Sequence, residues 1–215
     1  MTNKIIGIQG DKLDKINISS DTSIFLAHEA QQLGYKIFYY TPSNLSIIKN
    51  KTYANGVFVK FNYERKKFYK IYKKQKIDVE NLKFILIRQD PPFNSEYLIT
   101  TLILDGLKKV KVINNPTAIR NVSEKLYSKH FIKYMPNTLF SNNIEEIKKF
   151  YKQNKSMIMK PINGYGGNQI HLIKNKFNKK LITNFLNKNG HSMFQKFLKN
   201  ISKGDKRVFI INGKV

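Results

Sequence analysis

The sequence predicts an α/β protein in two parts, and three observations support that class. Strand and helix patterns alternate up to about residue 118, an order that builds a parallel sheet with helices packed on it. Strands and helices then follow in an order typical of a smaller α+β unit, which we place at 119–215. An apolar content of 41% in a chain of 215 residues is enough for a hydrophobic core in each part.

The first part opens with a β-α-β unit. An apolar strand over 4–8 precedes a helix that Ser20 or Asp21 can cap at its start. Gly34 is suited to end this helix, and a second strand covers 36–40. The apolar residues of the helix recur at the spacing that places them on one face: Ile24, Ala27, Ala30 and Leu33.

The rest of the first part is read from three further patterns. Lysine and tyrosine dominate 52–76, which is either a hairpin or an excursion from the sheet. A buried strand over 83–87 ends at the polar sequence RQDPP. A helix capped by Ser95 then runs to about residue 109, and a strand over 110–114 follows it.

The second part is predicted to alternate differently. Asn121 or Ser123 can cap its first helix, and Asn143 its second. Asn212-Gly213 is a strong signal for a two-residue hairpin, so we expect the chain to be truncated inside a structural element. The predicted helices cover 124–133, 144–153 and 179–187, and the predicted strands cover 156–160, 169–174, 192–198 and 207–211.

The net charge of +25 raises the question of a nucleic-acid partner, which we do not favour. Only four of the 39 basic residues are arginine, the side chain best suited to read base edges. Lysine, asparagine and isoleucine dominate the composition, as codons rich in A and T would produce. We therefore expect most lysines to be solvated.

Other classes are excluded by composition. The absence of cysteine excludes disulfides, thiolate metal sites and thiol catalysis. No secretory signal precedes the first strand, and the most apolar window, 97–104, is too short and too polar to span a membrane. We expect a cytoplasmic protein without a membrane partner.

The segment "MKPINGYGGNQIHLIK" (Met159–Lys174) places Lys160 on a strand before a glycine turn and a second strand. A Walker loop needs Lys-Ser/Thr after its last glycine, and a dinucleotide fingerprint needs a helix there; both are missing. The turn is therefore either a lid whose N–H groups cover nucleotide phosphates, as in protein kinases, or an ordinary hairpin. Its glycines are Gly164, Gly166 and Gly167.

Several separated blocks resemble, in order and spacing, the bacterial glutathione synthetases of the ATP-grasp superfamily. They are "INISSDTSIFLAHEAQQLGY", "ILIRQDPPFNSEYL", "NNPTAIRNVSEKLYSKHF", "IMKPINGYGG" and "GDKRVFIINGKV", and the likeness covers essentially the whole chain. The resemblance implies an ATP-grasp fold. Its N-terminal Rossmann-like substrate domain would cover 1–118, and an incomplete nucleotide-binding domain 119–215, with a lid at about 121–199.

This resemblance implies the final step of glutathione biosynthesis, in which ATP drives the joining of γ-glutamylcysteine and glycine through an acyl phosphate. By analogy, Lys125 and Lys160 hold phosphates beneath the lid glycines. Arg88 and Asp90 bind the peptide, and a guanidinium can clamp its carboxylate. Asp205 faces the ribose and Arg207 the reacting groups, so the catalytic residues are Arg207 and Lys160. The strand that would pair with adenine carries Gln195, Lys196, Phe197 and Leu198.

The family uses Mg²⁺, and the resemblance places its acidic ligands beyond residue 215. Magnesium prefers carboxylate oxygens, and after residue 107 the chain has only Glu124, Glu145, Glu146 and Asp205. We expect the three glutamates on helices away from the glycine turn. The chain is therefore predicted to contain no metal ligands and to show little or no turnover alone.

Two alternatives remain open. Besides a glutathione synthase-type ligase, the chain could be another ATP-grasp carboxylate–amine ligase with a different acceptor. The second alternative is a non-catalytic nucleotide- or partner-binding remnant. The RQDPPF block favours the γ-glutamylcysteine side of the family over a changed acceptor. A homo-oligomer or a complementing C-terminal chain are the protein partners that the resemblance suggests.

Overall fold

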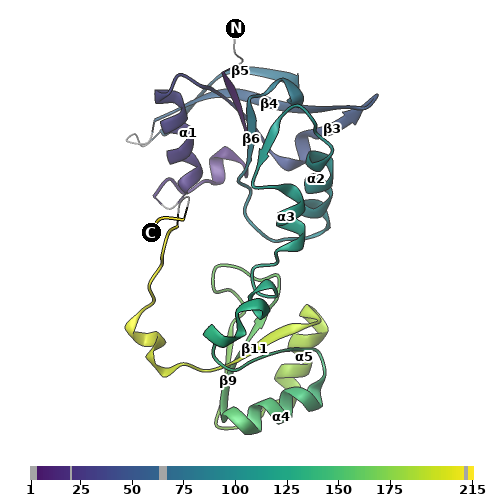
Figure 1. Ribbon diagram of the computed structural model, residues 1–215, viewed down its shortest axis with the longest axis vertical. Coiled ribbons are helices and arrows are strands. Elements are labelled where there is room, and N and C mark those ends of the chain that lie inside the picture. Colours follow the sequence, from purple (N-terminus) through teal and green to yellow (C-terminus); the bar gives the residue numbers. More distant parts are fainter. Residues whose placement is uncertain (1–3, 20, 63–66, 211–212) are drawn as a thin grey trace. The chain divides into compact units, whose positions relative to one another are not determined.

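The computed structural model describes residues 4–19, 21–62, 67–210 and 213–215. The chain divides into two compact units, Met1–Val122 and Ser123–Val215 (Figure 1). The division falls a few residues after the boundary that we placed from the sequence. Each unit has its own sheet and its own core.

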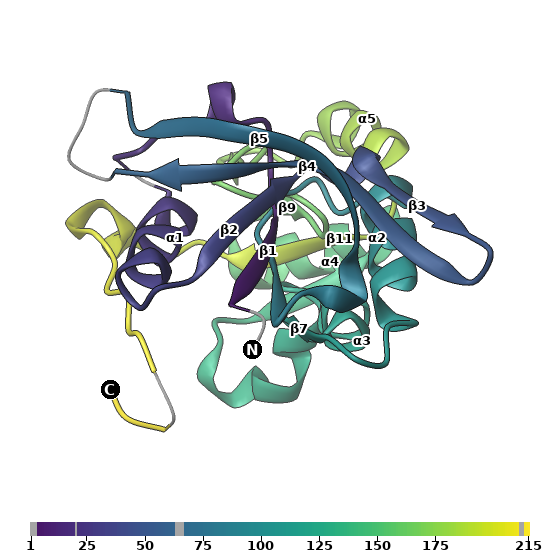
Figure 2. The ribbon, with the colours of Figure 1, turned by 90° about the horizontal axis from the view of Figure 1, so that it is seen from above.

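The first unit is built on a seven-stranded sheet of order β3-β4-β2-β1-β6-β7, with β5 paired to β4. Strands β2, β1, β6 and β7 are parallel neighbours, whereas β3, β4 and β5 pair in the antiparallel sense. Figure 2 shows β4 and β5 lying alongside each other. The strands are β1 Ile5–Gln9, β2 Lys36–Tyr40, β3 Leu45–Ile48, β4 Lys51–Phe61, β5 Tyr69–Asp78, β6 Phe84–Ile87 and β7 Lys111–Ile113.

Helices cover both faces of this sheet. Helix α1 (Thr22–Gln32) packs Ile24 and Ala27 against one core cluster, and α2 (Ser95–Asp105) packs Leu104 into the other. Because side chains alternate along a strand, β1 and β6 supply residues to both clusters. A short helix, α3 (Pro116–Asn121), follows β7, and single 3-10 turns cover Leu13–Lys15, Pro42–Asn44 and Val79–Asn81.

Local signals in the first unit were mostly read correctly. The Asp21 carboxylate accepts the backbone N–H of Ser23 at 2.6 Å and caps α1, and Gly34 follows the helix at φ +81°. The lysine- and tyrosine-rich stretch forms the β4–β5 hairpin. The expected cap of α2 was wrong: Asn94 caps it, accepting from the backbone N–H of Tyr97 at 3.0 Å, because an amide oxygen one residue earlier reaches that donor.

The second unit contains a four-stranded antiparallel sheet of order β10-β9-β11-β8. Helices α4 and α5 supply Ile147 and Ile182 to a core that also holds Met157, Met159 and Phe194 of the sheet (Figure 1). The elements are β8 Thr138–Ser141, α4 Ile144–Asn154, β9 Ser156–Pro161, β10 His171–Lys174, α5 Lys179–Asn189 and β11 Ser192–Lys196, with 3-10 helices at Tyr127–Tyr134 and Lys199–Lys203.

Two expectations for this half of the chain were wrong. The helix predicted at 124–133 is a turn followed by the 3-10 helix Tyr127–Tyr134, because Asn115 and Pro116 start a helix earlier and it ends at Asn121. The strand predicted at 207–211 is absent from its described part, 207–210, which is exposed and belongs to no sheet. A strand needs a partner for its backbone groups. Ile211 and Asn212 lie outside the described residues.

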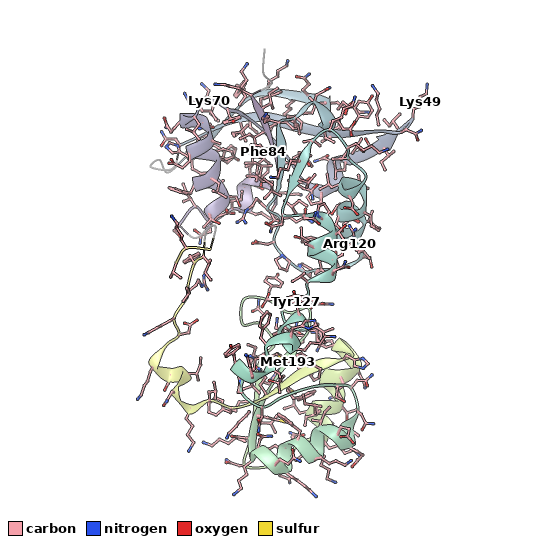
Figure 3. All side chains as sticks on the ribbon, viewed as in Figure 1. Lys49, Lys70, Phe84, Arg120, Tyr127 and Met193 are labelled. Carbon is pink, nitrogen blue, oxygen red and sulfur yellow. The ribbon has the colours of Figure 1, made fainter. Side chains whose placement is uncertain are left out.

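Lysines such as Lys49 and Lys70 project outward from the first unit, whereas Phe84 is turned toward its interior (Figure 3). This placement agrees with mostly solvated lysines. None of the helices in the described ranges combines the length and apolar character that crossing a bilayer requires.

Candidate functional site

The glycine turn of the second unit joins β9 to β10. The two strands pair from Ser156 opposite Lys174 to Met159 opposite His171, so Lys160 is the first residue of β9 beyond the pairing. The second strand begins at His171 and not at the expected Gln169, because Gln169 has a positive φ of 58° that is incompatible with a strand. The sequence thus gives a strand, a nine-residue turn over 162–170, and a strand.

Each glycine of the turn has its own structural requirement. Gly166 and Gly167 have φ values of +59° and +73°, a region that other residues adopt only with strain. Gly164 is required by close approach, because a Cβ there would lie 2.4 Å from Cγ of Pro161. Nothing lies within 4 Å of a Cβ built on Gly167, so the far side of the turn is open.

Lys125 ties this turn to the start of the unit. Its Nζ donates a hydrogen bond to the carbonyl oxygen of Gly164, and its side chain is only 14% exposed. The carboxylate of Glu124 lies 3.5 Å from the same Nζ. Glu124 was expected on a helix away from the turn, which was wrong: it lies in the 124–126 turn because the helix ends at Asn121.

Lys160 is half-buried and close enough to Lys125 for their charges to interact. Burial, followed by the positive charge of Lys125, lowers the pKa of Lys160, and the charge of Glu124 only partly opposes this. The two ammonium groups predicted to share a phosphate site are therefore brought together. A bound anion would relieve the repulsion between them.

A hydrogen-bonded chain holds the Lys160 ammonium in place. Its Nζ donates to Oε1 of Gln195 at 2.8 Å, and Nε2 of Gln195 donates to Oγ1 of Thr138 at 2.9 Å. Gln195 was expected in a strand whose backbone groups pair with adenine, and its side chain accepts the hydrogen bond from Lys160. Thr138 lies on β8, a strand that was not predicted from the sequence, so this series of hydrogen bonds was not predicted either.

The other residues of the strand expected to pair with adenine are Lys196, Phe197 and Leu198, and β11 ends at the first of them. The backbone N–H of Lys196 donates to Asn137 and that of Phe197 to Ser156, while the Leu198 side chain is exposed. Asp205 and Arg207 are exposed and follow the 3-10 helix Lys199–Lys203. In the described part of the chain, no side-chain hydrogen bond or ion pair joins either residue to the glycine turn.

The first unit contains a separate cavity of about 550 Å³ at the carboxyl ends of β1 and β6. The chain leaves β1 for β2 on one side, while β6 pairs on the other side, and ligands of open α/β sheets bind at such a switch point. The cavity is lined by Asp11, Lys12, Lys15, Ile16, Asn17, Asp21, Thr22, Arg88 and Asp90.

Arg88 is fixed against the first turn of α1. Its Nε donates to Oγ of Ser23 at 2.9 Å and its Nη2 to Oγ1 of Thr22 at 2.8 Å. A guanidinium has five N–H donors, so these two bonds orient the group while leaving donors for a ligand carboxylate.

Asp90 carries the charge opposite to that of Arg88 and lines the same cavity as the carboxylates of Asp11 and Asp21. Its backbone N–H donates to Oδ2 of Asp11 at 2.8 Å. Burial, then the charges of Asp11 and Asp21, raises the pKa of Asp90, and Arg88 opposes the shift. The cavity therefore presents both signs, with three carboxylates facing Arg88 and two lysines. Such a site suits a ligand that carries both an ammonium and a carboxylate.

Arg88 and Asp90, which were predicted from the sequence, line this cavity together with Asp11 and Asp21, which were not predicted. A signal for them existed: both occur in the polar segment directly after the first parallel strand, at the sheet edge where ligands bind. No cluster of three or more His, Asp and Glu side chains able to hold a metal ion occurs within the described ranges.

Family models match nearly the whole chain. The model described as "Prokaryotic glutathione synthetase, N-terminal domain" matches residues 5–120, and "Prokaryotic glutathione synthetase, ATP-grasp domain" matches residues 124–215.

Curated relatives agree. The chain is 36% identical over 216 residues to a glutathione synthetase from Buchnera aphidicola subsp. Acyrthosiphon pisum. It is 33% identical over 213 residues to one from Vibrio parahaemolyticus, and 35% over 213 residues to one from Wigglesworthia glossinidia brevipalpis. Each match covers 97% of this chain and 67% of the relative. The chain thus spans about two thirds of the length of these relatives, which agrees with the expectation of a chain shorter than its family.

Solved structures of low identity share the fold. D-cycloserine synthetase DcsG matches with a TM-score of 0.58 at 10% identity, covering 92% of this chain and 60% of its own. D-alanyl-alanine synthetase A from Vibrio cholerae matches at 0.54 and 15%, covering 93% and 60%. The ATP-grasp ligase PsnB, complexed with a precursor variant, Mg and ADP, matches at 0.54 and 14%, covering 92% and 66%. The predicted α/β, ATP-grasp fold is confirmed.

Proposed function

This chain belongs to the prokaryotic glutathione synthetase family, and we propose that it binds the substrates of a glutathione synthase-type ligase, the peptide in its first unit and ATP in its second. The proposed reaction transfers the γ-phosphoryl group of ATP to the cysteinyl carboxylate of γ-glutamylcysteine. The amine of glycine then attacks the acyl phosphate, forms the amide bond and releases phosphate. ADP is the other product.

The observation that carries this proposal is the pair of lysines at the glycine turn. Burial lowers the pKa of Lys160, and the positive charge of the nearby Lys125 lowers it further. A polyphosphate between them would replace this repulsion with attraction, and N–H groups of the turn would add hydrogen bonds. In phosphoryl transfer most of the work is the stabilisation of charge on the transferred group, which these residues are suited to supply.

Fewer backbone groups of the strand β11 are available to bind adenine than the sequence suggested. Because the N–H groups of Lys196 and Phe197 already donate to protein carbonyls, a purine beside β11 would pair with carbonyl oxygens or with groups beyond Phe197. The roles of Asp205 at the ribose and Arg207 at the reacting carboxylate rest on the family likeness alone.

The peptide end fits the charges of γ-glutamylcysteine, which has two carboxylates and one ammonium. We assign a carboxylate to Arg88, whose guanidinium is held by Thr22 and Ser23. We assign the ammonium to the carboxylates around Asp90, since a cation there would favour the ionised form of Asp90, which burial and the charges of Asp11 and Asp21 disfavour.

ATP-grasp ligases of solved structure include one bound to Mg and ADP, and we propose that ATP is used here together with Mg²⁺. The described residues do not form a metal site by themselves. We therefore name no magnesium ligands in this chain and assign no step to the metal.

Isothermal titration calorimetry of the chain with ATP, in the presence and absence of Mg²⁺, tests the proposal. We expect saturable binding of ATP that is weakened when Lys160 is replaced by alanine. A chain that binds γ-glutamylcysteine but not ATP under either condition would contradict the assignment of the second unit. A chain that binds ATP but not the peptide would contradict the assignment of the first.

A further inference from the structure

A buried pair of glutamines lies behind the cavity of the first unit. Gln9 ends β1 and Gln89 follows β6 by two residues, and their side chains are 0% and 8% exposed in relative terms. Nε2 of Gln9 donates to Oε1 of Gln89, and Nε2 of Gln89 reaches Oγ1 of Thr100 on α2 at 3.5 Å. The sequence analysis gave neither glutamine a role.

The alternation of side chains explains which way the pair faces. Ile85 and Ile87 of β6 belong to the core cluster that contains Leu104 of α2, and Gln89 continues this row to contact Thr100. Arg88, between them, contacts α1 on the other face. The glutamine pair therefore holds from behind the same turn that presents Arg88 and Asp90 to the cavity.

Further hydrogen bonds join the same two segments. The backbone N–H of Arg88 donates to the carbonyl oxygen of Gln9 at 2.7 Å, and the N–H of Asp90 donates to the Asp11 carboxylate. The segment 9–11 is thus bound to 88–90 by a backbone bond, a carboxylate on the cavity side and the amide pair on the far side.

The amide pair is not the most stabilising choice for a buried position. Oε1 of Gln9 is buried without a hydrogen-bond partner in the described part of the chain. Burying an unpaired polar atom costs free energy that two apolar side chains of similar shape would avoid. What the pair provides instead is a directional bond, which fixes the spacing of the two segments where apolar contact would permit several.

We propose that Gln9 and Gln89 are positioning residues of the peptide site, acting through the backbone of 88–90 on Arg88 and Asp90. This inference rests on the proposed function, because the ligand positioned is γ-glutamylcysteine. Neither glutamine is among the described residues that line the cavity, so the pair acts by fixing the positions of residues that do.

The variants Gln9→Leu, Gln89→Leu and the double variant test this, with melting temperature and the Kd for γ-glutamylcysteine measured on the full chain. Each single variant leaves an amide unpaired and should lower both stability and affinity. The double variant removes both amides and should recover the melting temperature, yet bind the peptide about tenfold more weakly. A double variant that binds like the unsubstituted chain would overturn the inference.

Thr101→Val is the matched control. Thr101 is also buried on α2, and its hydroxyl donates to the carbonyl oxygen of Leu98 and to no group of the amide pair. We expect a lower melting temperature without a change in Kd. Loss of affinity in this control would mean that any damage to α2 weakens binding, which contradicts a specific role for the glutamines.

Gln89→Glu adds a readout in pH. A protonated carboxyl keeps one acceptor for Gln9 and one donor for Thr100, whereas the ionised form loses the donor. Affinity relative to the unsubstituted chain at the same pH should be near normal at low pH and fall as the introduced carboxyl ionises. Taking the ratio at each pH compares the variant with the pH dependence that the unsubstituted chain itself shows. A pH-independent ratio overturns the inference; no binding by the unsubstituted chain overturns the proposed function and the inference with it.

Discussion

The two candidate sites of this chain differ in the like charges that they hold close together: ammonium groups at the lid and carboxylates in the cavity. At the lid, burial and the charge of the Lys125 ammonium lower the pKa of Lys160, and Glu124 opposes this only in part. In the cavity, three carboxylates gather beside Arg88 and the pKa of Asp90 is raised. In each case the protein holds like charges in an arrangement that a ligand of opposite charge would stabilise. The lid therefore suits a polyanion and the cavity a ligand with an ammonium.

The sites also differ in how their functional groups are held. Arg88 and Asp90 follow a buried strand and are hydrogen-bonded to α1 and to the segment after β1. The lid is a glycine turn, and the side chain that we found hydrogen-bonded to it is Lys125. The hydrogen bonds of the cavity thus hold its functional groups in a fixed geometry. The glycines of the lid instead allow its backbone to approach a ligand closely.

The largest expected effect is at the lid. Replacing Lys160 by alanine removes a charged hydrogen bond worth about 1.5–3 kcal/mol, so ATP affinity should fall roughly 10–150-fold. The affinity for γ-glutamylcysteine should not change. Calorimetry with each ligand measures both, and Lys174→Ala, an exposed lysine on β10, is the matched control. Equal ATP affinity for the Lys160 variant and its control would remove Lys160 from the site.

A smaller effect is expected in the cavity from Arg88→Lys. The positive charge remains, but the planar fork that binds a carboxylate through two parallel bonds is lost, so peptide affinity should fall about tenfold. ATP affinity should stay the same, which is the reverse of the Lys160 result. Arg120→Lys is the control, because Arg120 pairs with Asp105 and should affect stability only. An unchanged peptide affinity in Arg88→Lys would show that the site recognises the carboxylate by the positive charge alone and does not need the planar guanidinium.

The β-α-β unit could be predicted from sequence because its signals are local. Strand β2 matched the predicted 36–40 because four of its five side chains are buried, and Asp21 caps α1 as a residue of its type should. Strand β8 was missed because Thr138–Ser141 has no local pattern and forms by pairing with β11. The VFII stretch after Arg207 had a strand pattern, but its described residues have no strand to pair with.

The candidate site divides along the same line. The lysine and the glycines of the lid could be named from a motif, since their spacing is local. The contact of Lys125 with Gly164 and the bond of Lys160 to Gln195 join residues far apart in sequence, and no local pattern predicts them. The acidic side of the cavity was foreseeable from the position of polar residues after a parallel strand.

A third prediction compares two glycines of the lid. Gly167→Ala meets open space and suffers only from its positive φ, so it should cost about 1 kcal/mol of stability. Gly164→Ala should cost more, because its Cβ would meet Pro161. Its backbone must then move, and with it the carbonyl that Lys125 binds. Thermal unfolding measures the difference, and equal losses would mean that the turn adapts to either substitution.

The smallest effect separates stability from binding in the cavity. Because the folded-state pKa of Asp90 is raised above its ordinary value of 3.8, its contribution to stability is full below that value and is lost as pH rises through the folded pKa. Asp90→Asn should therefore increase the free energy of unfolding near neutral pH by less than about 1 kcal/mol after solvent screening, and a higher melting temperature would show it. The gain should disappear as pH falls below 3.8.

The same variant should weaken peptide binding at neutral pH, since the ammonium loses one of three carboxylates. Asp105→Asn is the contrasting control: the hydrogen bonds from Arg120 and Thr117 lower the pKa of Asp105, so its removal should destabilise the protein at neutral pH and leave binding alone. A stabilised Asp90→Asn that binds the peptide normally would mean that the repulsion among the cavity carboxylates has no ligand to relieve it. The comparison of the two sites by the like charges that they hold together would then fail for the cavity and hold only for the lid.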